Sequence, residues 1–111
     1  NKIGGSLDLS SLTSAEGLKL PDEIGGGLYL RGITSAEGLE LPNKIGGSLD
    51  LSSLTSAEGL KLPDEIGGTI YLTSLESLEG LDLSSSLILK MVFSDKIKNQ
   101  LENQMLKIFN I

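Results

Sequence analysis

An Ile-Gly-Gly triplet recurs along the chain at a constant interval of 21 residues, and three prolines keep the same interval. The residues concerned are Ile3, Ile24, Ile45 and Ile66, with Pro21, Pro42 and Pro63. Self-similarity at a period of about 20 to 50 residues is typical of solenoids, in which each unit covers the apolar face of the next. The repeat therefore restricts the chain to a stack of units, one to a turn.

The units are of two alternating kinds. Residues 1–26 and 43–68 are identical, whereas the unit between them differs at several positions, so the deeper period is 42 residues. Each unit holds two segments of alternating apolar and polar residues. They are Leu7/Leu9 and Leu18/Leu20, Leu28/Leu30 and Leu39/Leu41, Leu49/Leu51 and Leu60/Leu62, and Ile70/Leu72 and Leu81/Leu83.

Short alternating segments bracketed by Gly or Pro are typical of half-buried strands. Stacking the units about 4.8 Å apart would pair like strands and enclose a continuous Leu/Ile core. We therefore predict a mostly β fold over residues 1–93: a parallel β-solenoid or leucine-rich-repeat stack with 21-residue turns and two short strands per turn. The Gly-Gly pairs are expected at tight corners with positive φ, and proline is expected to end the second strand.

The pattern LKLPDEIGGSLDLSSL resembles the bacterial 21-residue leucine-rich repeats called IRREKO-type, which nest two LxL cores in each unit. The resemblance covers residues 3 to about 93 and implies a leucine-rich-repeat fold with a recognition role. The family's Asn, three residues after the first core, is replaced here by Glu23, Lys44 and Glu65. Without an Asn ladder, a straighter β-solenoid is expected than the usual horseshoe.

The last segment, residues 94–111, has a different pattern. Ser94 and Asp95 suit a helix N-cap, and apolar residues then recur at helical spacing. We predict an amphipathic helix that caps the core, following a last strand around Met91 and Phe93. The capping residues expected are Ile97, Leu101, Met105 and Ile108. A dimerising helix or a partner-binding helix is the alternative.

The composition excludes several classes of function. Nine Lys and Arg against fifteen Asp and Glu give a net charge of −6, which disfavours nucleic acid and anionic membranes as partners. There is no His and no Cys, so the usual general base and soft metal ligands are missing. We expect no enzyme, no cofactor and no metal site, and the sequence does not indicate a localisation.

One outward row carries aromatic residues and is the predicted partner-binding site. It consists of Asp8, Tyr29, Asp50 and Tyr71, with Arg31 beside it. Tyr and Arg are enriched at interaction hot spots, although Tyr also suits a plain solvated strand.

Two further outward rows carry charge. A column of Glu16, Glu37, Glu58 and Glu79 could collect a cation, although solvated glutamates at that spacing are tolerable without one. The row Lys19, Glu40, Lys61 and Asp82 alternates in sign and is expected to set register.

We therefore predict a non-catalytic protein-recognition module whose partner is another protein of unknown identity. The alternative is a structural or self-assembly element. The chain begins at Asn1 in the middle of the pattern, so an uncapped N-terminal edge that forms a homo-oligomer is expected in that case.

Overall fold

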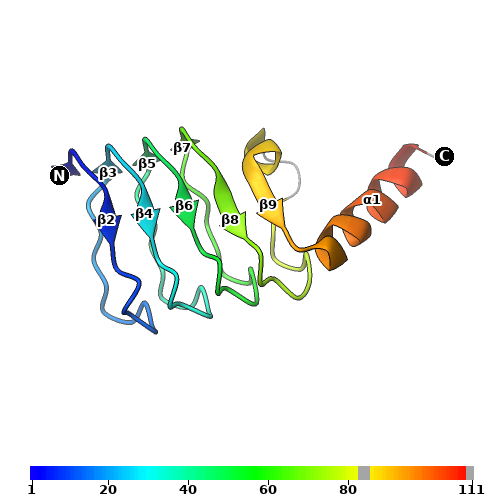
Figure 1. Cartoon of the computed structure of the whole chain (residues 1–111), viewed down its shortest axis with the longest axis horizontal. Helices are drawn as coiled ribbons and strands as arrows, with labels where there is room; N and C mark the ends of the chain where they lie inside the picture. The colour runs from blue at the N-terminus through cyan, green and yellow to red at the C-terminus, as the bar shows by residue number, and fades with distance from the viewer. Residues whose placement is uncertain (83–85, 110–111) are drawn as a thin grey trace.

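A computed structural model describes residues 1–82 and 86–109. Four turns of a parallel β-solenoid are followed by a last strand and a C-terminal helix, in a body with principal extents of 47 × 24 × 19 Å (Figure 1). Turns 1, 2 and 3 are residues 1–21, 22–42 and 43–63, and turn 4 begins at residue 64. The predicted architecture, with two short strands per turn, is confirmed.

Two parallel sheets run along the solenoid. Sheet A contains β1 (Lys2–Ile3), β3 (Glu23–Ile24), β5 (Lys44–Ile45) and β7 (Glu65–Ile66). Sheet B contains β2 (Leu7–Asp8), β4 (Leu28–Tyr29), β6 (Leu49–Asp50), β8 (Ile70–Leu72) and β9 (Met91–Phe93). Each strand pairs with the strand 21 residues further on, so equivalent residues of successive turns are direct neighbours.

The core is a column of aliphatic side chains between the sheets. Leu28, Leu30 and Ile33 of turn 2 are fully buried, as are Leu49 and Leu51 of turn 3. Burying a Leu or Ile side chain contributes roughly 1.5 to 3 kcal/mol, and the repeat supplies such residues in every turn. The stacking of turns therefore holds the fold together without a large central core.

The prediction for the second strand of each turn was wrong in position. The strand forms at the dipeptide before Gly-Gly, such as Glu23–Ile24, and not at the second Leu-x-Leu segment. There the first leucine turns back within its own unit, since the amide of Leu18 donates to the carbonyl of Ala15 at 3.0 Å. The proline that follows has no amide to donate to a ladder. Leu18 and Leu20 nevertheless pack against the core, half-buried.

The prediction for the glycine corners was also wrong. Positive φ angles occur at the glycine after the Glu of each unit, namely Gly17, Gly38, Gly59 and Gly80. The Gly-Gly pairs serve a different need, because successive pairs stack on each other. A Cβ on Gly25 would lie 2.5 Å from the carbonyl oxygen of Gly4, which is closer than real Cβ contacts allow.

The C-terminal end closes the two sheets differently. Sheet B continues into β9, in which Met91 pairs with Ile70 and Phe93 with Leu72, as predicted. Sheet A instead ends under a short 3-10 helix, η1 (Ser86–Lys90). The Nζ of Lys90 donates to the carbonyl of Ile66, a role that backbone amides of the following turn fill at earlier turns.

The helix α1 (Asp95–Phe109) starts where the sequence predicts. The Oγ of Ser94 accepts a hydrogen bond from the amide of Ile97 at 3.4 Å, so Ser94 is the N-cap. Ile97 is fully buried and Leu101 packs partly on the core, while the rest of α1 extends away from the turns (Figure 1). The side chains of Met105 and Ile108 lie outside those described, so the capping role remains a prediction.

Among the described residues, no helix combines the length and the apolar character that crossing a membrane requires.

Candidate functional site

The predicted recognition residues form one row across sheet B. In the parallel register Asp8 pairs with Tyr29, Tyr29 with Asp50, and Asp50 with Tyr71. Their neighbours along each strand are leucines or, at Ile70, an isoleucine, which belong to the core or pack against it, so side-chain alternation places the row on the outer face. Arg31 follows Tyr29 by two residues and lies on the same face. The structure therefore brings the five residues together.

Arg31 is held in place by two neighbours. Its Nε donates to Oδ2 of Asp50 at 2.7 Å, and its Cζ lies 5.0 Å from the centroid of the Tyr29 ring. These distances suit a charge-assisted hydrogen bond and a cation–π contact. The Arg31 side chain is still 54% exposed. Arg31 is thus a fixed cation that remains accessible to a partner.

Asp50 is not the exposed recognition residue that we predicted, since only 7% of its surface is accessible. The Arg31 side chain bonds one carboxylate oxygen, and the Ser52 amide donates to the other at 3.0 Å. A buried carboxylate with both oxygens bonded serves as a support for its neighbours. Asp50 therefore positions Arg31, and Arg31 is the member of the pair that a partner can reach.

The carboxylate of Asp50 remains charged despite its burial. Burial raises the pKa of Asp50, but the hydrogen bonds from Arg31 and Ser52, with the charge of Arg31, outweigh this effect and lower it. The pKa of Arg31 is raised in turn, chiefly by its hydrogen bond to Asp50. Both partners of the pair are ionised at neutral pH.

The two tyrosines of the row have different surroundings. Tyr71 is 37% exposed, whereas Tyr29 is half-buried. A Cβ on Gly27 would meet the ring and hydroxyl of Tyr29 within about 3 Å, so the Tyr29 side chain folds back over this glycine. The equivalent position before Tyr71 is Thr69. Gly27, which the sequence reasoning did not single out, therefore makes room for the ring that supports Arg31.

Asp8 occupies the exposed end of the row in turn 1. Its Oδ1 accepts a hydrogen bond from the Ser10 amide at 3.0 Å, as Asp50 does from Ser52. Hydrogen bonding to Ser10 lowers the pKa of Asp8. Among the described residues no ion pair is made by Asp8, and its carboxylate is exposed, although the charge of Arg31 also contributes to lowering its pKa.

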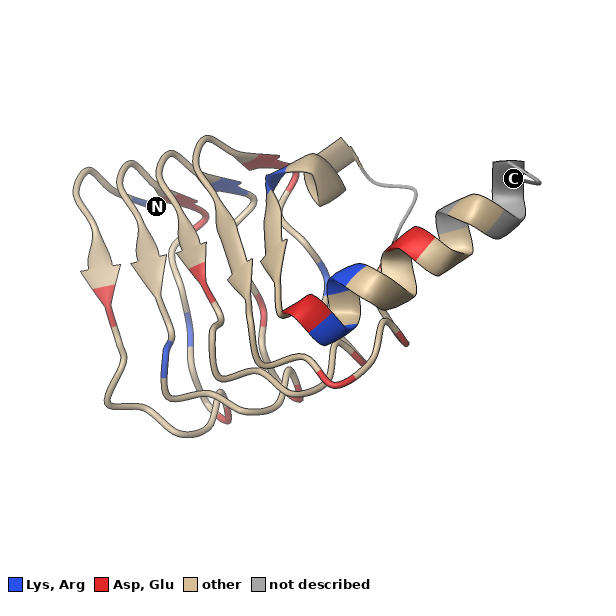
Figure 2. Cartoon of the chain, turned by 45° about the vertical axis from the view of Figure 1, so that its right-hand side comes forward, with Lys and Arg blue, Asp and Glu red and all other residues tan. Residues whose placement is uncertain are grey.

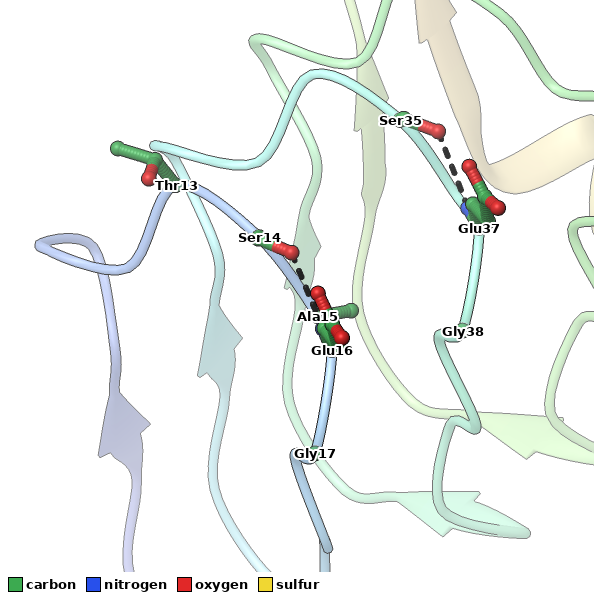
Figure 3. A pocket seen from close by; sticks show the side chains of 8 residues that line it. All are labelled: Thr13, Ser14, Ala15, Glu16, Gly17, Ser35, Glu37 and Gly38. Atoms are coloured by element: carbon green, nitrogen blue, oxygen red, sulfur yellow. Dashed lines mark hydrogen bonds between the residues drawn. The ribbon is translucent and has the colours of Figure 1, made fainter.

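The glutamates of the predicted column lie in the loops that follow sheet B. Glu16 and Glu37 each use their amide to bond the serine two residues earlier, Ser14 and Ser35, and their side chains line a shallow groove (Figure 3). No group of three or more acidic side chains close enough for a metal ion occurs among the described residues.

The alternating charges that bridge the turns lie on sheet A. Lys2 Nζ is 3.8 Å from Glu23 Oε2, and Lys44 Nζ is 3.5 Å from Glu65 Oε2. Among the described residues, no such bridge joins Lys19 to Glu40 in the predicted outward row. Figure 2 shows basic and acidic strands alternating along sheet A. The alternation is visible in the sequence, because the residue before each Ile-Gly-Gly alternates between Lys and Glu.

No family model, curated protein or solved structure matches the chain.

Proposed function

We propose that the chain is a non-catalytic protein-recognition module that binds its partner through the outer face of sheet B. The observation that carries this proposal is the arrangement around Arg31, a cation held by Asp50 and Tyr29 while more than half of its side chain stays exposed. Holding Arg31 in advance lowers the entropy lost on binding, which favours affinity. Interaction hot spots are enriched in such Tyr and Arg residues.

The chemistry of this face favours a protein partner that offers an acidic group beside an apolar one. The hydrogen bond to Asp50 uses Nε of Arg31, so the terminal amino groups are the part that a partner carboxylate would meet. Tyr71, in the same row, supplies exposed aromatic surface. The net charge of −6 opposes a phosphate backbone as the alternative anionic partner.

The proposal includes membership of the bacterial leucine-rich repeat proteins. It is supported by the 21-residue period and by the two Leu-x-Leu segments in each unit. Recognition without catalysis is supported by the sequence, which contains no His or Cys and repeats most of its polar residues in several units. A catalytic site needs one specific combination of polar residues at one place, which such repetition does not favour.

Partner capture compared across matched variants tests the proposal. Tagged wild-type chain, Tyr71→Ala and Glu37→Ala would be used to capture proteins from the source cells, with quantitative mass spectrometry as the readout. Tyr71 lies on the sheet B face, whereas Glu37 lies in the loop groove of Figure 3. A partner held by wild type and Glu37→Ala, but weakened by about 1 to 3 kcal/mol in Tyr71→Ala, is the expected result. Equal retention by both variants would exclude this face.

A further inference from the structure

Turns 2 and 4 are units of the same kind, and each carries a tyrosine on the outer face of sheet B. The residues around the two tyrosines differ, and one of the differing positions lies in the strand that follows. The equivalent residues, with turn 2 named first, are Gly27 and Thr69, Tyr29 and Tyr71, Arg31 and Thr73, and Asp50 and Val92. Each differing position lies two residues from its tyrosine or beside it in register, on the outer side of the sheet. The differences therefore change the surface of the sheet and not its core.

These replacements leave the ring of Tyr71 open to solvent. Tyr29 folds back over Gly27 and lies against the guanidinium of Arg31, and it is half-buried. In turn 4, Thr69 carries a Cβ at the place that the Tyr29 ring occupies in turn 2. The Tyr71 ring is exposed, and the half-buried Val92 stands in register beside it. Turn 4 thus presents an apolar patch where turn 2 has a ring already packed on its own cation.

Arg31 borders this apolar patch. Its Nε reaches Oδ2 of Asp50 in turn 3 at 2.7 Å, so the guanidinium leans from turn 2 towards turn 4. Asp50 is in register with Tyr71, and neighbouring strands lie about 4.8 Å apart. The exposed cation and the exposed ring are therefore separated by one to two strand spacings, about 5 to 10 Å.

The size of the face restricts what can bind to it. Sheet B consists of five strands, each of two or three residues. With about 4.8 Å between strands and 3.3 Å per residue, the face measures about 20 by 10 Å, on the order of 200 Å². A stable interface between folded proteins buries about 800 Å² on each side. The face alone accommodates a short chain segment and is too small for a folded domain or a second copy of this chain.

We propose that the segment recognised by sheet B is short and extended, with an acidic residue two positions away from an aromatic or large aliphatic one; this inference rests on the proposed function. The carboxylate bonds the terminal amino groups of Arg31, and the apolar side chain covers Tyr71 and Val92. Side chains two residues apart on an extended chain point the same way and lie about 6 to 7 Å apart, which matches the separation of cation and ring. The segment runs across the strands, with its apolar residue nearer to β9.

Selection from a phage library of random 12-residue peptides on the full chain tests the proposal. The enriched peptides are expected to share an acidic residue and an aromatic or large aliphatic residue with one residue between them. The same selection on Tyr71→Ala is expected to lose the apolar preference, whereas Tyr71→Phe, which keeps the ring, and Glu37→Ala, in the loop groove, should keep the whole pattern. Circular dichroism would verify that each variant is folded.

The contact with Arg31 is tested on the peptide, so that the pair between Arg31 and Asp50 stays intact. Fluorescence anisotropy would compare the selected peptide with a version in which its acidic residue is replaced by the matching amide. A hydrogen bond to a charged group contributes about 1.5 to 3 kcal/mol, so the amide version is expected to bind at least about tenfold more weakly. A third version, with the acidic and apolar residues moved five positions apart, should lose a similar factor.

Enriched peptides without this pattern, equal binding of the three peptide versions, or no enrichment at all would overturn the short acidic segment. A dimer of the chain alone in sedimentation equilibrium that Tyr71→Ala abolishes would overturn it too, in favour of a second copy. The capture experiment on cell proteins separates this failure from that of the proposed function. If a captured partner is still weakened by Tyr71→Ala, recognition by sheet B stands and only the form of the partner is wrong.

Discussion

Replacing Asp50 with alanine is expected to destabilise the solenoid, and more strongly than the same replacement at Asp8. The two aspartates lie in identical 26-residue sequences, so intrinsic propensities and local hydrogen bonding to the following serine are matched. They differ in their contact with Arg31, which donates a hydrogen bond to Asp50 but acts on Asp8 through its charge alone. The comparison therefore reports mainly the hydrogen bond between Arg31 and Asp50.

The magnitude follows from the contacts that are lost. Asp50 accepts hydrogen bonds from Arg31 Nε at 2.7 Å and from the Ser52 amide at 3.0 Å. A hydrogen bond to a charged group contributes about 1.5 to 3 kcal/mol, and the exposure of Arg31 screens part of its share. We expect Asp50→Ala to cost about 2 kcal/mol, which lowers Tm by roughly 8 to 10 °C in a chain of this size. Asp50→Asn keeps an oxygen for Ser52 and is expected to cost about half as much.

Urea unfolding at pH 7, followed by circular dichroism, measures these differences in the free energy of unfolding. Arg31→Ala and the double variant with Asp50→Ala complete a double-mutant cycle, whose coupling energy reports the ion pair alone. Two results would refute the reasoning: an equal cost for Asp8→Ala and Asp50→Ala, or a coupling energy of zero between Arg31 and Asp50.

Three further predictions concern pH, the glycine corner and the helix. The pKa of Asp50 is lower in the folded protein than in the unfolded chain, so the ionised carboxylate stabilises the fold at pH values above the ordinary Asp pKa. This stabilisation is lost as the pH falls through the pKa that Asp50 has in the folded protein. The urea midpoints of wild type and Asp50→Asn should therefore converge below about pH 4. Gly46→Ala drives a Cβ into the carbonyl of Gly25 and should lower Tm sharply, whereas Gly4→Ala, with nothing within 4 Å, should leave it nearly unchanged. Ile97→Ala should cost about 2 to 4 kcal/mol in urea unfolding because the side chain is fully buried, and an unchanged midpoint would argue against the cap.

Periodicity was sufficient to predict the stack, its 21-residue register and the start of α1 at Asp95. Apolar residues recur at equivalent places in each unit, so the turns can be aligned in only one way. Ser94 marks the start of the helix because its hydroxyl can accept a hydrogen bond from a backbone amide of the first turn. The positions of the sheet A strands were not predictable in the same way. The segment at Lys2 and Ile3 lacks the Leu-x-Leu alternation that Leu18 and Leu20 show, and only the hydrogen bonds between turns decide which segment forms a ladder.

The recognition row was predicted by register, but the role of each residue was not. Burial of Asp50 depends on where the Arg31 side chain lies, and strand alternation carries no information on that. Gly27 offered a readable signal, since the other units have Ser or Thr at its place. Its meaning depends on the fold of the Tyr29 side chain over the backbone, a contact that appears only in three dimensions.

The alternation of Lys and Glu along sheet A has a consequence for how a gene of this kind can change in length. Deleting or duplicating a single 21-residue unit would place Lys beside Lys or Glu beside Glu at the new junction, in neighbouring strands of one sheet. The same event would separate Arg31 from the aspartate that holds it or set two aspartates side by side. Gain or loss of a 42-residue pair leaves every junction as it was. Recombination within the repeats is therefore expected to lengthen or shorten the protein by pairs of turns.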